Sequence, residues 1–367
     1  MQARSSPPGD FVRESTNRHD YRTNNPSCMK PALIRKLARI RENSASREFI
    51  LADAKDADMA WGVPSAGEIY PRMTGRARHR TMPEFHEQIR EVVRQGIVDI
   101  LLASTSTMSR LAHQERLFDK SNVTPAIRAN DTSDVWLPRG GKYREHPSLP
   151  FSSSYIEEAQ FGSVIGARRS KPVVNLGLYS MTYNNDARAD LETQKAFREF
   201  RAEARRKGFN YFLEVFPPNV NAGLGRGEIP SFVNDHICRT LAGVSLPDRP
   251  AFLKVPFFGP RALEELAAYD PSMVLGVMGG GNGTTYDAFK LLADAQKYGA
   301  RVALYGRKIK AAEDPLTFIV FLRRIVEGEI TAKEAVKAYH GELKSKKIHP
   351  RRSLAADMKI TDTSLNY

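Results

Sequence analysis

The sequence predicts a (β/α)₈ barrel, an α/β fold in which parallel strands close into a cylinder that helices surround. Short apolar segments alternate eight times with segments of helical periodicity, which implies a parallel sheet with right-handed crossovers. Eight repeats favour closure into a barrel over an open doubly wound sheet. The last two predicted strands end in glycine, in the place where such barrels frequently bind phosphate.

The predicted elements follow one another with little interruption. Strand-like segments are Phe49–Asp53, Val98–Ser104, Pro125–Asn130, Pro172–Tyr179, Tyr211–Val215, Ala251–Val255 and the two that begin at Val274 and Val302. Helical patterns cover Met82–Gln95, Ser109–Phe118, a segment from about Ser154, Asp186–Lys207, Ile229–Ala242, Pro260–Tyr269, Pro315–Val326 and Thr331–Leu343. We expect a capping box between Thr331 and Glu334.

The two ends of the chain differ from its middle. Residues 1–29 are polar and without periodicity, so we expect a disordered N-terminal tail. Apolar residues at helical spacing between Pro31 and Arg41 predict an N-terminal helix that closes one end of the barrel. A single barrel domain, this helix included, therefore spans residues 30–345. Residues 346–367 are expected to form a loose basic tail.

The composition excludes several classes of protein. No apolar run approaches the roughly 18 residues that span a bilayer, and the N-terminus has no apolar signal core, so we expect a cytoplasmic protein. Cys28 and Cys238 are the only cysteines, which argues against disulfides and a cysteine zinc site. The net charge of +13 is spread over helices that carry both signs, which argues against nucleic acid as a partner, and we expect attraction of anionic substrates. A homo-oligomer is left open.

Charged residues interrupt four strands at or near their C-terminal ends, where barrel enzymes build active sites. They are Asp53, Glu214, Lys254 and Arg307. Lys254 shares a face of its strand with Phe252, and an apolar site favours a neutral amine that can attack a carbonyl and form a Schiff base. The alternative is a structural ion pair with Glu214 or Asp53.

Glu214 and Asp53 are the candidate proton carriers. Neighbouring strands lie about 4.8 Å apart, so Glu214 can reach Lys254 and move protons, or serve only as its counter-ion. Asp53 opens a loop in which it can bind a substrate hydroxyl or act as an acid or base. That loop also holds Asp56 and Asp58, but it lacks the glycine and distal glutamate of a calcium loop, and we expect no metal.

Glycines and one arginine predict a phosphate cradle after the last two strands, because glycine lets the backbone approach a ligand and amides at a helix start favour anions. Its expected members are Gly279, Gly280, Gly281, Asn282, Gly306 and Arg307. Lys55 can hold a second phosphate or pair with a carboxylate. Ser104 and the hydroxyls after it can bind a distal phosphate, although a helix N-cap at Ser106 or Thr107 is the commoner role.

Three motifs together resemble the class I aldolase superfamily, which includes bacterial and archaeal type fructose-bisphosphate, tagatose-bisphosphate and deoxyribose-phosphate aldolases. They are Ala251–Pro256, Val277–Asn282 and Ala303–Lys308. The resemblance implies that Lys254 forms the Schiff base, that the glycines and Arg307 hold a substrate phosphate, and that Asp53 matches a shared aspartate. Glu214 is similar to the glutamate of the tagatose-bisphosphate branch.

The chain departs from that pattern at two strands. Phe216 lies where archaeal-type aldolases carry an acid tyrosine, and the fourth strand lacks a lysine, so Glu214 or Tyr179 would supply the acid. The resemblance implies a lyase that acts on a phosphorylated sugar without a cofactor. Isomerisation or acyl transfer on the same barrel, or phospho-metabolite binding without catalysis, are the alternatives.

Overall fold

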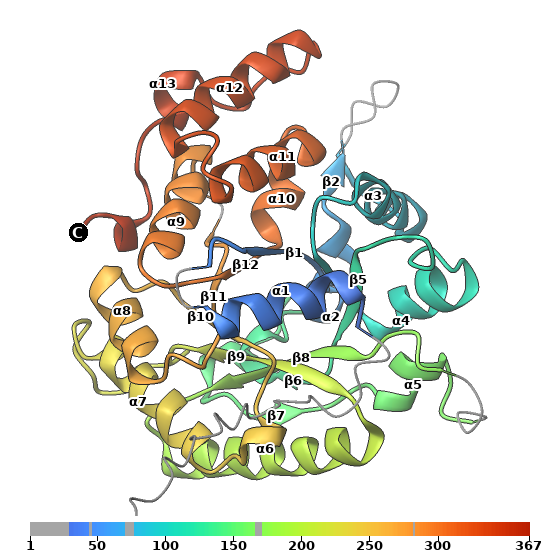
Figure 1. The fold of residues 1–367 in the computed structure, drawn as a ribbon, viewed down its shortest axis with the longest axis vertical. Coiled ribbons are helices and arrows are strands. Elements are labelled where there is room, and N and C mark those ends of the chain that lie inside the picture. Colours follow the sequence, from blue (N-terminus) through green and yellow to red (C-terminus); the bar gives the residue numbers. More distant parts are fainter. Residues whose placement is uncertain (1–28, 44–45, 70–76, 166–170, 282) are drawn as a thin grey trace, which may run out of the picture.

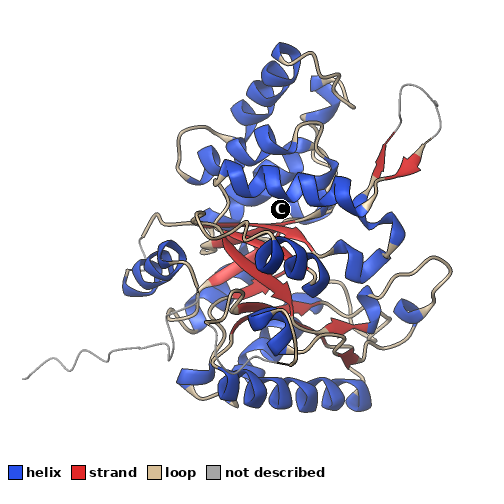
Figure 2. Ribbon diagram, turned by 90° about the vertical axis from the view of Figure 1, so that its right-hand side faces the viewer, coloured by secondary structure: helices blue, strands red, loops and turns tan. Residues whose placement is uncertain are grey.

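A closed parallel barrel forms the centre of the computed structural model, which describes residues 29–43, 46–69, 77–165, 171–281 and 283–367 (Figures 1 and 2). Around the barrel the strands are ordered β1-β12-β11-β10-β9-β8-β5-β4. Their bounds are β1 Ile50–Lys55, β4 Ile100–Ala103, β5 Thr124–Arg128, β8 Leu176–Thr182, β9 Asn210–Phe216, β10 Leu253–Val255, β11 Leu275–Met278 and β12 Val302–Tyr305. The predicted (β/α)₈ barrel is confirmed.

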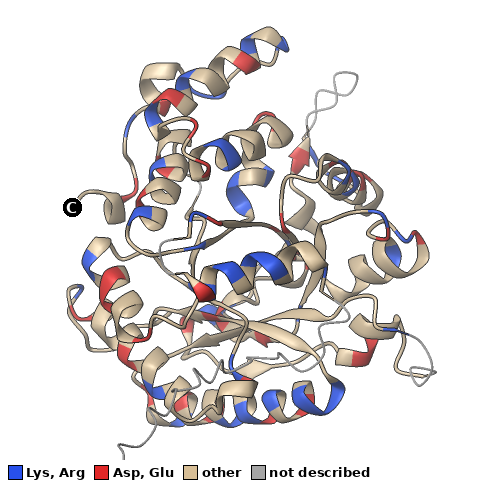
Figure 3. Ribbon diagram, viewed as in Figure 1, with Lys and Arg blue, Asp and Glu red and all other residues tan. Residues whose placement is uncertain are grey.

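Helices cover the barrel on all sides (Figure 1). The bounds are α2 Ala57–Trp61, α3 Met82–Gln95, α4 Thr105–Met108, α5 Ile156–Phe161, α6 Ala187–Lys207, α7 Ile229–Ala242, α8 Pro260–Tyr269, α9 Thr285–Lys297, α10 Arg307–Ala311, α11 Pro315–Val326 and α12 Ala332–Ser345. The predicted bounds of α3, α7, α8 and α11 are confirmed, as is the capping box of α12. Opposite charges are interspersed along helices such as α6 (Figure 3).

Most predicted strands shift by one or two residues, and two predicted elements differ more in their bounds. The helix expected over Ser109–Phe118 begins earlier, at Thr105, because the Ser104 hydroxyl accepts a hydrogen bond from the amide of Thr107. It continues as a π-helix over Ser109–Gln114. The fourth strand starts at Leu176 instead of Pro172 and runs to Thr182, since its ladder with β9 covers this whole range.

Strand alternation divides the core into an inner and an outer part. Ile50, Ala52 and their equivalents on the other strands fill the barrel, whereas the residues between them pack against the helices. Helix α1 (Pro31–Glu42) closes one end of the barrel with Leu33 and Leu37, as predicted. Met29 packs in the same inner core, so the folded part begins one residue before the predicted boundary. Residues 1–28 of the predicted tail lie outside the described residues.

Two short antiparallel hairpins extend from the barrel. One joins β2 (Glu68–Ile69) to β3 (Arg78–His79), and the other joins β6 (Asp131–Thr132) to β7 (Pro150–Phe151). The second hairpin lies in the Pro- and Gly-rich segment after the third strand and contacts β8, so this segment borders the C-terminal end of the barrel.

The C-terminal segment is ordered, and the expectation of a loose tail is wrong. After α12 it forms α13 (Leu354–Asp357) and a 3₁₀ turn (Thr363–Leu365), with Leu365 buried in the outer core. This segment also contacts the start of α9: the Thr284 hydroxyl donates a hydrogen bond to the backbone carbonyl of Lys359. In the part of the chain that the structure describes, no helix has the length and apolar character needed to cross a membrane.

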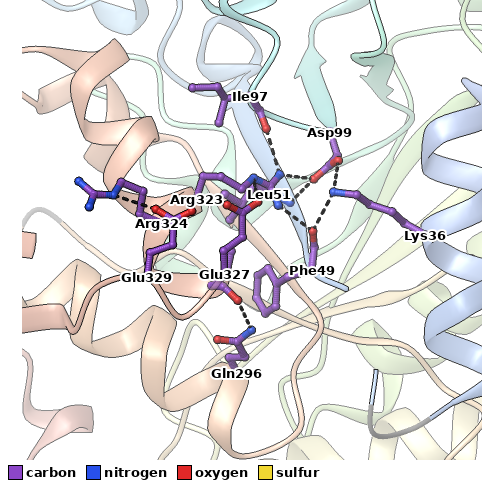
Figure 4. A network of polar contacts seen from close by, with 11 residues as sticks. Lys36, Phe49, Leu51, Ile97, Asp99, Gln296, Arg323, Arg324, Glu327 and Glu329 are labelled. Atoms are coloured by element: carbon purple, nitrogen blue, oxygen red, sulfur yellow. Dashed lines mark hydrogen bonds and ion pairs between the residues drawn. The ribbon is translucent and has the colours of Figure 1, made fainter. Parts of the chain in front are cut away.

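A partly buried carboxylate ties together the end of the barrel that α1 closes (Figure 4). Asp99 accepts hydrogen bonds from the amide of Leu51 at 2.9 Å and from Arg323 of α11 at 2.6 Å, and it forms an ion pair with Lys36 of α1 at 2.7 Å. Arg323 also binds the carbonyl of Phe49. One side chain thus joins α1, α11 and the start of β1.

Replacing Asp99 with alanine should leave two partly buried cations without their carboxylate. We expect the free energy of unfolding to fall by about 2 to 4 kcal/mol, as measured by urea denaturation. Glu327→Ala is a matched control, because Glu327 is 51% exposed and lies 3.8 Å from Arg323; its loss should be below about 0.5 kcal/mol. Equal losses in the two variants would contradict this assignment.

Candidate active site

Lys254 and Glu214 form an ion pair inside the C-terminal end of the barrel. They are register partners on β10 and β9, and the Lys254 ammonium contacts the Glu214 carboxylate. Both side chains point inward, because Phe252 and Phe212, two residues earlier on each strand, belong to the inner core. The Lys254 side chain is 10% exposed and that of Glu214 is 1% exposed. The lysine therefore has a charged partner, and its surroundings are not the purely apolar site that its neighbour Phe252 suggested.

Ser180 extends this pair to a third strand. It is the register partner of Glu214 on β8 and donates a hydrogen bond of 2.7 Å to Glu214 Oε2. The side chain of Asn130 holds the Ser180 backbone in place, since it accepts from the Ser180 amide at 2.7 Å and donates to the Ser180 carbonyl at 2.9 Å. Glu214 is thus fixed with one oxygen toward Lys254 and the other toward Ser180.

Arg128 and Asp56 complete the network on the far side of Ser180. Arg128, at the end of β5, donates to Asp56 at 2.6 Å and to Ser180 Oγ at 3.2 Å, and lies 3.9 Å from Glu214. Burial alone would lower the pKa of Arg128, but the carboxylates of Asp56 and Glu214 raise it above its ordinary value. Two cations and two carboxylates therefore alternate across the barrel mouth.

Asp53, the predicted partner at the end of the first strand, faces away from this network. Leu51, two residues earlier, packs in the outer core, and Ala52 packs in the inner core, so the Asp53 side chain lies between the barrel and its helices. It is fully buried, and it forms an ion pair with Lys55 at 3.1 Å. Burial raises the pKa of the Asp53 carboxyl. The inward-facing acid at the end of β1 is Asp56.

Lys55 and Ser104 have structural partners as well. Lys55 lies on the outer face of β1 and is 2% exposed. Ser104 caps α4 and donates a hydrogen bond of 2.5 Å to Asp58, so the N-cap is at Ser104 itself and not at Ser106 or Thr107. The structure places neither side chain in the Lys254 network.

Tyr179, the alternative acid, is also directed outward. Its ring packs between Phe197 and Phe200 of α6, and burial raises the pKa of its hydroxyl. Phe216 instead has the inward parity of Glu214. Of the two acids that the sequence offered, only Glu214 lies beside Lys254.

The glycine-rich loop after β11, with Gly279, Gly280, Gly281 and Gly283, lies next to the Gly306–Arg307 turn, as predicted. Arg307 approaches the carbonyl of Gly280 at 3.5 Å. Gly279 packs so closely on β12 that a Cβ atom there would lie 2.5 Å from the Tyr305 ring, and Gly280 has a positive φ of 72°. Gly281 is exposed at the surface of the loop. Asn282 lies outside the described residues.

The sequence analysis noted Asp56 only as a loop carboxylate and gave no role in the site to Arg128, Asn130 or Ser180. Strand alternation offered one signal: Ala52, Ala54 and Asp56 share a parity, and Asp53 does not. A surface pocket of about 330 Å³ lies beside α10, lined by Gly283 at the end of the glycine-rich loop and by Lys308. Another of about 530 Å³ lies at the α1 end, away from the site. Among the described residues no His, Cys, Asp and Glu side chains gather in the manner of a metal site.

No protein-family model matches the chain, and no curated protein matches its sequence. Solved structures do match. An archaeal fructose 1,6-bisphosphate aldolase superposes with a TM-score of 0.56 at 15% identity, covering 80% of this chain and 99% of the aldolase. A second archaeal structure of that enzyme, with its catalytic lysine bound to the carbinolamine intermediate, gives 0.55 at 15% identity and covers 79% and 99%. Cgl0159 of Corynebacterium glutamicum gives 0.55 at 16% identity and covers 82% and 99%. The chain shares the fold of Schiff-base aldolases.

Replacing Glu214 with alanine should leave Lys254 and Arg128 close together without the carboxylate between them. We expect unfolding in urea to show a loss of about 3 to 5 kcal/mol, because a buried charge then lacks its partner. Glu192→Ala removes a pair with Lys195 whose side chains are 51% and 60% exposed, and should cost less than about 0.5 kcal/mol. A Glu214 variant as stable as the control would show that the ion pair does not form in solution.

Proposed function

We propose that the protein is a class I aldolase: Lys254 forms a Schiff base with a phosphorylated sugar or ketose, and a carbon–carbon bond is then cleaved or formed. The observation that carries this proposal is the contact of Lys254 with Glu214 at the inner, C-terminal end of the barrel. A nucleophilic amine beside a proton carrier is the arrangement that imine formation requires.

Glu214 moves the protons of imine formation. It takes a proton from the Lys254 ammonium, and the neutral amine attacks the substrate carbonyl carbon. Protonated Glu214 then gives that proton to the former carbonyl oxygen, which becomes the hydroxyl of a carbinolamine. Glu214 next removes a proton from the nitrogen and delivers it to this hydroxyl, which leaves as water. The product is an iminium on Lys254, with Glu214 again ionised.

The iminium then accepts the electrons of the breaking bond. A carboxylate removes the proton of the substrate hydroxyl on the carbon of that bond that lies farther from the iminium, this carbon leaves as an aldehyde, and the remaining fragment is an enamine on Lys254. Glu214 and Asp56 are the carboxylates of the network, and Arg128 and Ser180 lie between them. Arg128 and Ser180 bind and orient substrate hydroxyls. Because the iminium is the electron sink, the reaction proceeds without an organic cofactor.

The substrate phosphate binds between the glycine-rich loop and Arg307. Backbone amides and a guanidinium are strong donors to phosphate oxygens. The surrounding charge supports this assignment: burial lowers the pKa of Lys310 on α10, and the nearby cations Lys55, Arg80 and Arg307 lower it further. Lys55 and Lys310 thus contribute to a positive potential beside the cradle, although Lys55 is buried behind β1.

Borohydride reduction should trap the imine on Lys254. We expect dihydroxyacetone phosphate, mixed with the protein and reduced, to give a peptide adduct at Lys254 by mass spectrometry. Lys254→Met should give no adduct and no turnover, because among the described residues Lys254 is the amine that contacts Glu214.

Two controls make the trapping specific. The exposed Lys195 should stay unmodified in the same digest, which excludes non-specific reduction of surface imines. Retention of phosphate binding by Lys254→Met would show that this variant is folded. An unmodified Lys254 in a wild-type protein that still binds phosphate would refute the Schiff-base mechanism.

Matched substitutions of Asp56 and Asp53 test which carboxylate at the end of β1 takes part in proton transfer. Asp56→Asn should lower the turnover number by about 10²-fold or more, since proton transfer by a positioned group typically contributes that much. Asp53→Asn makes the same change of charge on the outer face of β1. Its turnover per folded molecule should stay near the wild-type value, as measured in the same assay after active-site titration. A larger loss in Asp53→Asn than in Asp56→Asn would reverse the assignment.

A further inference from the structure

The last fifteen residues, 353–367, cross the start of α9 and are here called the C-terminal strap. We propose that Asp357 and Thr361 of this strap are positioning residues that hold the glycine-rich loop in the shape that binds phosphate. This inference rests on the phosphate cradle of the proposed function and adds to it a dependence on the C-terminus of the chain.

Asp357 binds the beginning of α9 directly. Its Oδ1 accepts a hydrogen bond of 2.8 Å from the amide of Thr285, the first residue of that helix. Its other oxygen lies 3.0 Å from Nε2 of His340 on α12. The carboxylate is buried. Asp357 therefore links the start of α9 to α12 of the outer layer.

Thr361 acts through Asp287, which lies in the first turn of α9. The Asp287 carboxylate accepts hydrogen bonds from the amides of Thr284 and Thr361, each 2.8 Å long, and from the Thr361 hydroxyl. Burial alone would raise the pKa of Asp287, but the hydrogen bonds from Thr361 and Thr284 lower it. The cap of α9 is thus shared between the helix and the strap.

These contacts determine where the glycine-rich loop ends. A side chain at Gly283 would collide with the Asp287 carboxylate and approach the Thr361 hydroxyl, so the loop is held between α9 and the strap. From the other side Lys308, which is buried, donates a hydrogen bond of 2.8 Å to the Gly283 carbonyl. If Asp357 or Thr361 is removed, one side of this clamp is lost and the amides of the loop are less well ordered for an anion.

The strap has other anchors, so a single substitution does not release it. Leu365 is buried, and Tyr367 packs edge-on against Phe257 and Tyr298. Asp357→Ala and Thr361→Val should consequently fold, and their effects should be confined to the loop.

The test is calorimetric titration of the full-length protein with inorganic phosphate. We expect the Kd to rise about tenfold in Asp357→Ala and in Thr361→Val, the size expected when one buried hydrogen bond that orders the site is lost. Asp357→Asn retains the Oδ1 acceptor and should restore binding to within about threefold of wild type. Asp235→Ala changes the charge equally at an exposed position of α7 and should leave the Kd unchanged. Arg307→Ala should lose detectable binding.

Two results would overturn the inference. The first is a Kd for phosphate within twofold of wild type in both Asp357→Ala and Thr361→Val, while Arg307→Ala abolishes binding. The second is a wild-type protein that binds no phosphate. Borohydride trapping of unphosphorylated dihydroxyacetone on Lys254 tests the Schiff base independently of phosphate binding. Failure of the strap inference can therefore be told apart from failure of the proposed function. An adduct with unchanged phosphate affinity in the strap variants refutes only the strap. Weakened phosphate binding in those variants without any adduct refutes only the Schiff base.

Discussion

The candidate site depends most on the ion pair between Lys254 and Glu214, because two charges at a nearly buried position are costly unless each satisfies the other. The other residues of the network contact this pair directly or hold a residue that does. Ser180 occupies the second oxygen of Glu214, Asn130 fixes the backbone of Ser180, and Arg128 brings Asp56 to the same group of side chains. Such a network is weak evidence for stability, but it is the arrangement that proton transfer next to an amine requires.

The period of two along a β-strand decides which charged residues share this site. Lys254, Glu214 and Ser180 meet because they are register partners on adjacent strands. Asp53 is excluded because it has the parity of Leu51 and not that of Ala52. The glycines at the ends of β11 and β12 follow a different constraint, since at Gly279 the close approach of Tyr305 leaves no room for a side chain. The site therefore combines inward side chains of the barrel with backbone at its rim.

The C-terminal strap links the outer layer of helices to that rim. Its polar sequence has no helical periodicity of its own, yet the strap is ordered because its carboxylate and hydroxyl groups meet free amides and a carboxylate at the start of α9. The glycine-rich loop is thereby fixed by residues about 75 positions later in the chain. In the proposed function, this makes the phosphate affinity sensitive to a segment that never enters the barrel.

Local patterns in the sequence determined the barrel and the bounds of several helices. They also offered the pairing of Lys254 with Glu214 as an alternative to a lysine in an apolar site. These features follow from periodicity and from strand spacing, which act over a few residues. The tertiary structure alone decided that Asp56 and Arg128 join the site, that Asp53 and Tyr179 face outward, and that the last residues clamp the loop. The reason is physical: register, inward direction and long-range hydrogen bonds depend on how strands close and where distant segments pack, and a one-residue shift in a strand exchanges its two faces.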